Sequence, residues 1–173
     1  KPVVLSAPTG HKDKVLEHHQ VFAPMPSGLR YELRHYLKIR MLQSPRSARW
    51  FKPAKNLLLL LLLPFYLLEK LLLPFDSHWS WTFSAYCRGL RLIRDKKLSL
   101  IYSTGGANCA HFAGYLLAKR TGLPWVAEIH DPMIHQDWKK GFFQYRQAAF
   151  AEKLVCERAD IAFWFTPTAL ARA

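Results

Sequence analysis

The sequence has few cysteines and no arrangement of them that would build a site. Cys87, Cys109 and Cys156 show neither paired nor zinc-type spacing. This excludes a disulfide framework and a zinc finger, and it favours a reducing compartment. Cys109 stands near the start of an expected helix, where its thiol has either a lowered pKa or a plain packing role.

Acidic residues are also scarce. The 173 residues include 12 Asp and Glu against 25 Lys and Arg, a net charge of +13. Such an excess predicts an acidic partner: a nucleotide, a phospholipid surface or a nucleic acid. No helix-turn-helix, zinc finger or RNA-binding motif is present, so we do not predict nucleic-acid binding. His11, His18 and His19 lack ligand partners at useful spacing, so we predict no metal site and no cofactor.

No apolar run is long enough to span a bilayer, which takes about 20 uninterrupted residues. The leucine-rich run from Leu57 to Phe75 is broken by Pro64 and by the pair Glu69-Lys70. It follows a basic and aromatic stretch: Arg46, Arg49, Trp50, Lys52 and Lys55. This combination predicts a helix in the bilayer interface, with the basic residues contacting anionic headgroups. The alternatives are a buried helix and one packed on a sheet.

The flanking segments predict alternating strands and helices. Residues 2–6 predict a strand, residues 7–28 a loop, and residues 29–37 a second strand, because Leu29, Tyr31 and Leu33 alternate with charged residues. A helix is expected from Thr82 or Ser84 to about Lys97. Residues 143–158 predict another helix, residues 161–165 a strand, and Thr166-Pro167 a further helix start.

The most informative stretch is residues 98–132, LSLIYSTGGANCAHFAGYLLAKRTGLPWVAEIHDP. It predicts a strand over 98–102, a helix from Cys109 to Arg120 with Asn108 as N-cap, and a second strand over 125–129. Two strands joined by one helix are parallel, so the loops that follow them share one edge of the sheet. That edge is where open α/β sheets bind ligands.

Both loops at this edge carry candidate site residues. Gly105 and Gly106 precede the start of a helix, which favours anions. His130 and Asp131 follow the second strand. A titratable histidine beside an anion-binding loop is a reasonable catalytic arrangement. The alternative is that the glycines only make the turn and that His130 and Asp131 only cap the next segment.

The same stretch resembles the N-terminal domain of retaining GT-B glycosyltransferases of family 4. The shared features are a strand, a short loop of small residues, a helix with H-x-x-G-x-x-L, and then tG-x-P-W-V-x-(D/E)-x-(H/R)-D-P. The sequence ERADI at 157–161 is similar to the family's next helix-to-strand passage, and residues 81–98 are similar to its preceding helix. The resemblance covers residues 76–168 and is faint before them.

The resemblance implies two Rossmann-like domains, of which the N-terminal one binds the acceptor and the C-terminal one most of the nucleotide-sugar. It implies sugar transfer without an essential metal, in many members to lipid-linked or membrane-bound acceptors. His130 falls where several members place a histidine near the transferred sugar. We therefore predict His130 as catalytic and Gly105, Gly106, Asn108 and Asp131 as substrate-binding residues.

These inferences give one expectation for the whole chain. We predict an α/β, Rossmann-like three-layer domain over residues 1–173 with a mostly parallel sheet and a membrane-contact insertion at about 38–75. The family's donor-binding C-terminal domain and its first glycine-rich loop are absent from the sequence. We therefore expect a fragment that is inactive alone, from an enzyme at the inner face of the plasma membrane. The alternative is a non-enzymatic phosphate- or nucleotide-binding module or a membrane-surface module.

Overall fold

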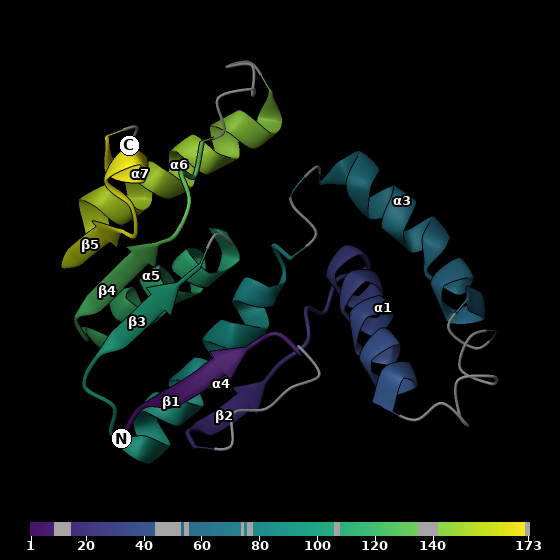
Figure 1. Cartoon of the computed structure of the whole chain (residues 1–173), viewed down its shortest axis with the longest axis horizontal. Helices are drawn as coiled ribbons and strands as arrows, with labels where there is room; N and C mark the ends of the chain where they lie inside the picture. The colour runs from purple at the N-terminus through teal and green to yellow at the C-terminus, as the bar shows by residue number, and fades with distance from the viewer. Residues whose placement is uncertain are drawn as a thin grey trace. The chain divides into compact units, whose positions relative to one another are not determined.

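The computed structural model describes residues 1–8, 15–43, 53, 56–73, 75, 78–105, 108–134 and 142–171. The chain forms two compact units, Lys1–Ser84 and Ala85–Ala173. Each unit is described by itself. Both contain parallel strands together with helices, so the predicted α/β class is confirmed (Figure 1). One domain over residues 1–173 stays a prediction.

The first unit begins with a parallel strand pair. Strand β1 (Val3–Ser6) lies beside β2 (Glu17–Gln20), with Val3 opposite Glu17 and Ser6 opposite Gln20. The predicted strand at 2–6 is confirmed, whereas the predicted loop over 7–28 is wrong, because β2 lies within it. The sequence of β2, EHHQ, has no apolar residue that would signal a strand. Backbone pairing with β1 forms it, supported by a contact of 2.8 Å between Ser6 Oγ and His18 Nε2.

The predicted strand over 29–37 is also wrong, because helix α1 (Pro26–Gln43) occupies these residues. Leu29, Leu33 and Leu37 fit the four-residue spacing of a helix face as well as they fit alternation. All three are half-buried, whereas Tyr31 is exposed. Pro26 suits the first helical turn. Packing of this face thus decides between two periodicities that the sequence leaves open.

Helix α3 (Leu63–Leu72) packs beside α1, and residues 56–61 before it are also helical (Figure 1). Its polar residues point inward. Glu69 is only 5 % exposed and accepts hydrogen bonds from Ser27 N, Ser27 Oγ and Trp79 Nε1 at 2.7, 2.6 and 2.8 Å. Lys70 donates to the carbonyl of Phe75. This side of the helix is therefore fixed by polar contacts.

The opposite side of the same helical stretch is apolar and exposed. Exposed side chains run along it from one end to the other: Leu57, Leu58, Leu60, Leu61, Phe65, Leu67, Leu68, Leu71 and Leu72. We call these residues the outer leucine face. Over the described part of the chain, no helix is both long and apolar enough to cross a bilayer.

The second unit contains a parallel sheet in the order β3-β4-β5. Its strands are β3 (Ile101–Thr104), β4 (Trp125–Ile129) and β5 (Ile161–Trp164), and its helices are α4 (Trp81–Lys96), α5 (Asn108–Thr121), α6 (Phe143–Arg158) and α7 (Pro167–Leu170). The boundary between the units falls within α4. The predicted strand–helix–strand unit is confirmed, with its first strand displaced toward Thr104.

One face of this sheet is covered and holds the core. Alternate residues of β3 and β4 are buried there, among them Ile101, Trp125 and Ile129, and Leu117 of α5 and Val155 of α6 pack on them. On the other face lie the residues that alternate with the buried ones along β3 and β4, and these are half-buried or exposed. The alternating burial of side chains along β3 and β4 thus gives the sheet a buried face and a solvent-accessible face, which we call the covered face and the open face.

Gly114 allows α5 to approach this sheet closely. A Cβ atom at this position would lie 2.6 Å from Trp125 Nε1 and 3.2 Å from Ser103 Cβ. The first distance is shorter than any normal contact. The glycine of the H-x-x-G motif therefore has a packing role, and it allows His111 of the same helix to lie close to β3.

Candidate functional site

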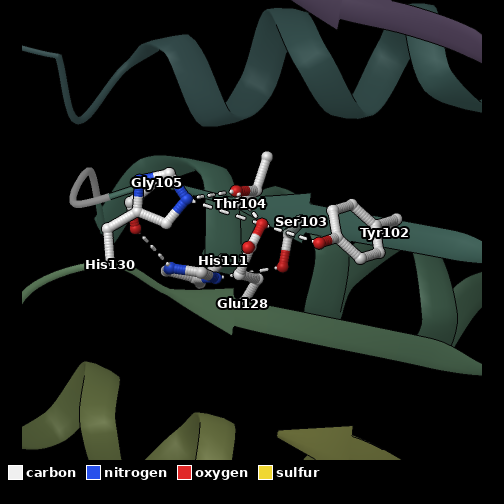
Figure 2. A network of polar contacts seen from close by, with 7 residues as sticks. All are labelled: Tyr102, Ser103, Thr104, Gly105, His111, Glu128 and His130. Carbon is white, nitrogen blue, oxygen red and sulfur yellow. Dashed lines mark hydrogen bonds and ion pairs between the residues drawn. The ribbon is translucent and has the colours of Figure 1, made fainter. Parts of the chain in front are cut away.

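The parallel pairing of β3 and β4 brings their last residues together. Thr104 lies directly opposite Glu128, and each strand ends toward the same edge of the sheet. The loops that begin at Gly105 and His130 therefore share this edge, as the sequence predicted. Two polar networks meet here, one on each face of the strand pair (Figure 2).

The first network, on the open face, centres on the carboxylate of Glu128. Tyr102 and Thr104 both donate their hydroxyl hydrogens to Glu128 Oε2, at 2.6 and 2.5 Å. His130 Nε2 lies 3.1 Å from Thr104 Oγ1 and 3.5 Å from Glu128 Oε2. Figure 2 shows the three side chains converging on this one oxygen.

The hydrogen-bond pattern sets the tautomer of His130. The only hydroxyl hydrogen of Thr104 is directed to Glu128, so Thr104 Oγ1 can only accept from the imidazole. His130 Nε2 must then carry a hydrogen, and in the neutral ring Nδ1 is left as a hydrogen-bond acceptor. Within the described residues Nδ1 makes no hydrogen bond, and the side chain is half exposed. His130 therefore offers a defined acceptor nitrogen to solvent or to a ligand.

The same contacts shift two pKa values in opposite directions. The hydroxyls of Thr104 and then Tyr102 lower the pKa of the Glu128 carboxyl below its usual range, because they stabilise the charged form. The hydrogen bond to Glu128 raises the pKa of the Tyr102 phenol. Both shifts keep Glu128 charged and Tyr102 protonated at neutral pH, which is the state that the geometry requires.

The second network lies on the covered face. Trp125 Nε1 donates to Ser103 Oγ at 2.8 Å, Ser103 Oγ lies 3.0 Å from His111 Nδ1, and His111 Nε2 lies 3.2 Å from the carbonyl oxygen of Gly105. A carbonyl only accepts, so Nε2 carries the hydrogen and Ser103 donates to Nδ1. Burial lowers the pKa of His111, which keeps the ring neutral in this position.

The buried hydrogen-bond network fixes the start of the loop that follows β3. Gly105 has a φ of 114°, a conformation that side chains with a Cβ rarely adopt. Its carbonyl is fixed by His111, which is itself fixed through Ser103 and Trp125. The strand ends and the glycine turn are therefore preorganised from beneath, while His130 remains accessible above.

The structure brings some of the predicted site residues together. Gly105 and His130 lie at the same edge, linked through Thr104. Asn108 is the first residue of α5, and Asp131 is exposed directly after His130. Gly106 lies outside the described residues, as do all five predicted membrane-contact residues: Arg46, Arg49, Trp50, Lys52 and Lys55. The catalytic and binding roles of the predicted residues remain predictions.

The sequence analysis missed five participants at this edge: Tyr102, Ser103, Thr104, His111 and Glu128. A signal was present, because the positions of Thr104 and Glu128 in two neighbouring parallel strands predict that they face each other. His111 also stood inside a quoted motif. Among the described residues, no group of three or more His, Cys, Asp or Glu side chains is placed to hold a metal ion.

Comparison with known protein families gives one match. The profile of the Glycosyl transferase 4-like domain matches residues 18–173, which is most of the chain and includes both polar networks. Neither a curated protein nor a solved structure matches the chain significantly.

Proposed function

Because the chain belongs to the glycosyl transferase 4-like family, the N-terminal GT-B domain of family 4 enzymes, we propose that it forms the acceptor-binding half of a retaining glycosyltransferase. The sugar would come from a nucleotide-sugar held mainly by a C-terminal donor-binding domain. The acceptor would be a lipid-linked or cell-envelope glycan. The observation that carries this proposal is the shared edge where Thr104, Glu128 and His130 meet.

The geometry of this edge supports a contact between His130 and the transferred sugar or its acceptor. The Glu128–Thr104 pair orients the imidazole and fixes its hydrogen on Nε2, so that Nδ1 can accept a hydrogen bond from a sugar hydroxyl. Preorganised contacts of this kind favour the transition state because no reorganisation is needed during transfer. In this proposal Gly105, Gly106, Asn108 and Asp131 line the substrate side of the same edge.

The departing nucleotide diphosphate would need positive charge nearby. The start of α5 follows the glycine loop, and the backbone N–H groups of a helix start favour anions. The chain's net charge of +13 acts in the same direction over longer range. No metal or other cofactor enters this proposal.

We further propose that the enzyme is cytoplasmic and binds the inner face of the plasma membrane through the outer leucine face. A helix of a water-exposed protein normally turns apolar residues inward, whereas this one buries Glu69 and exposes Leu71 by 80 %. Large exposed apolar patches mark interaction surfaces. Helices that lie in a bilayer interface combine such a face with basic neighbours, and the sequence provides them at residues 46–55.

Transfer activity of the full-length gene product tests the role of His130. We expect His130→Ala to lower the transfer rate at least tenfold, because the oriented imidazole is lost. His35→Ala is the matched control, since His35 is an exposed histidine on α1. A His130→Ala enzyme within about threefold of the wild-type rate would remove this role.

Vesicle co-sedimentation tests the membrane contact. The double variant Leu71→Gln, Leu72→Gln is expected to reduce binding to vesicles that contain anionic lipid by at least fivefold. Leu100→Gln is the control, because Leu100 is an exposed leucine outside this face. Equal binding of both variants would refute the contact. Stronger retention on duplex DNA than on vesicles at two salt concentrations would also refute it.

A further inference from the structure

The first unit contains a cavity on the inner side of the leucine-rich helix. It has a volume of about 160 Å³ and lies between α1 and the helical residues 56–72. Its described lining residues include two arginines and two tyrosines, and none of these residues is acidic: Ser27, Arg30, Tyr31, Arg34, Leu59 and Tyr66. Two cations without a carboxylate among these described residues favour an anion.

Arg30 is held in a fixed position at this cavity. Its guanidinium carbon lies 4.9 Å from the centre of the Tyr66 ring, a cation–π contact. Its Nε atom is buried and has no hydrogen-bond partner among the described residues. A buried guanidinium N–H without an acceptor is costly, and an anion beside the guanidinium would offset part of that cost through its negative charge.

Arg34 supplies a second cation one helical turn further along the same face of α1. Its side chain is exposed. Within the described residues, neither Arg30 nor Arg34 forms an ion pair with a carboxylate. Two arginines four residues apart can therefore donate to one anion from two sides.

The start of α1 does not provide the anion contacts. Ser27 lies in the first turn, but its N–H and its hydroxyl both donate to the carboxylate of Glu69, at 2.7 and 2.6 Å. Glu69 thus already satisfies this helix start and adds a negative charge beside it. Any further anion must be attracted by the two arginines.

We propose that this cavity is a binding site for a phosphate group, held by Arg30 and Arg34. Arginine matches phosphate oxygens with paired N–H donors, and the cavity has room for one phosphate with part of its ester. The phosphate comes either from a lipid headgroup or from a free soluble phosphate. The outer leucine face lies on the other side of the same helix, so a lipid source agrees with the proposed membrane contact.

Two variants and one control test the site in the full-length protein. Arg34→Gln removes an exposed cation and leaves packing intact. Arg30→Lys keeps the charge but removes the planar guanidinium with its paired N–H donors. Arg91→Gln is the matched control, because Arg91 is an exposed arginine on α4 and the change in net charge is the same as for Arg34→Gln. Circular dichroism establishes that each variant is folded before binding is measured.

Two probes distinguish the sources. The first is inorganic phosphate, measured by calorimetry, and the second is phosphatidylcholine vesicles with and without phosphatidylglycerol, measured by co-sedimentation. For a free-phosphate site, Arg34→Gln and Arg30→Lys weaken phosphate binding at least tenfold and Arg91→Gln does not. For a lipid site, the same two variants lose binding to vesicles that contain phosphatidylglycerol, whereas their binding of inorganic phosphate does not differ from that of the wild type.

The proposal is overturned if wild-type protein binds neither probe, or if Arg34→Gln and Arg91→Gln behave alike with both. Neither probe reports sugar transfer. A phosphate site can therefore stand if the proposed transferase role fails, and it can fail while that role stands.

Discussion

The indole of Trp125 and the hydroxyl of Ser103 join the first residue of β4 to the third residue of β3 beneath the candidate site, with 2.8 Å between Nε1 and Oγ. Ser103 also donates to His111, whose other nitrogen holds Gly105. One buried hydroxyl therefore connects the core tryptophan with the loop that borders His130.

Ser103→Ala is expected to lower the free energy of unfolding by about 1–3 kcal/mol, because it leaves Trp125 Nε1 and His111 Nδ1 buried without partners. Chemical denaturation measures the change. Ser99→Ala is the control, since Ser99 is exposed just before the same strand. Equal stability of the two variants would contradict the role of the buried hydrogen-bond network.

Gly114→Ala is expected to destabilise the protein by about 1–3 kcal/mol through overpacking. The new methyl group would lie 2.6 Å from Trp125 Nε1, which belongs to a fully buried ring that is already hydrogen-bonded. Gly89→Ala is the matched comparison, because the three atoms nearest to its methyl group all belong to the flexible side chain of Leu117, the nearest at 2.7 Å. Thermal melts should show a clearly larger loss for Gly114→Ala, and the reverse order would argue against close packing at this point.

Glu128→Gln tests the outer network without an activity assay. The negative carboxylate raises the pKa of Tyr102, so a neutral amide should bring that pKa back toward its ordinary value near 10. The measurement is an NMR titration of carbon-13-labelled tyrosine, with Tyr102→Phe to assign the signal. Glu157→Gln, a change at an exposed glutamate of α6, should leave the titration unaltered. An unchanged Tyr102 titration in Glu128→Gln would show that the contact is not formed in solution.

Glu32 predicts a pH dependence of stability. Its carboxyl is 2 % exposed, Ala23 N donates to Oε2, and Oε1 has no partner among the described residues. Burial raises its pKa from 4.5 to about 7. Because the folded state holds this proton more tightly, the group's contribution to stability is present below pH 4.5 and is lost as the pH rises to 7, by on the order of 2–3 kcal/mol.

Denaturation of wild type and Glu32→Gln at pH 5, 6, 7 and 8 isolates this effect, because all other titrating groups are shared. The stability of wild type relative to Glu32→Gln should fall as the pH rises. A constant difference over this range would contradict the raised pKa.

The helices and strands of the second unit were predicted correctly because local sequence preferences and packing favour the same elements there. The apolar runs of β4 and β5, the glycines that end β3 and α5, and the helical spacing of α5 all indicate the elements that form. The edge shared by Gly105 and His130 followed from the parallel geometry alone. The pairing of Glu128 with Thr104 could be inferred from the same geometry, whereas the contacts that Tyr102 and His130 make with this pair depend on side-chain packing that the sequence does not show.

The first unit was predicted poorly for a physical reason. In α1 the same apolar residues fit two periodicities, and their spacing alone does not decide between them. In β2 the four residues are all polar, so pairing with β1 and side-chain contacts of His18 and His19 replace the usual apolar signal. The inward placement of Glu69 also depends on partners 42 and 10 residues away in sequence, Ser27 and Trp79.

The two sides of α3 should change at different speeds during evolution. Inward residues such as Tyr66 and Glu69 contact particular neighbours, so an exchange at either position demands a compensating exchange elsewhere. In the proposed membrane contact the outward leucines lie against fluid lipid chains, so these positions need only remain hydrophobic. Homologous chains would then conserve the residue identities at the inner positions, whereas the outer positions would vary among leucine, isoleucine, phenylalanine and methionine.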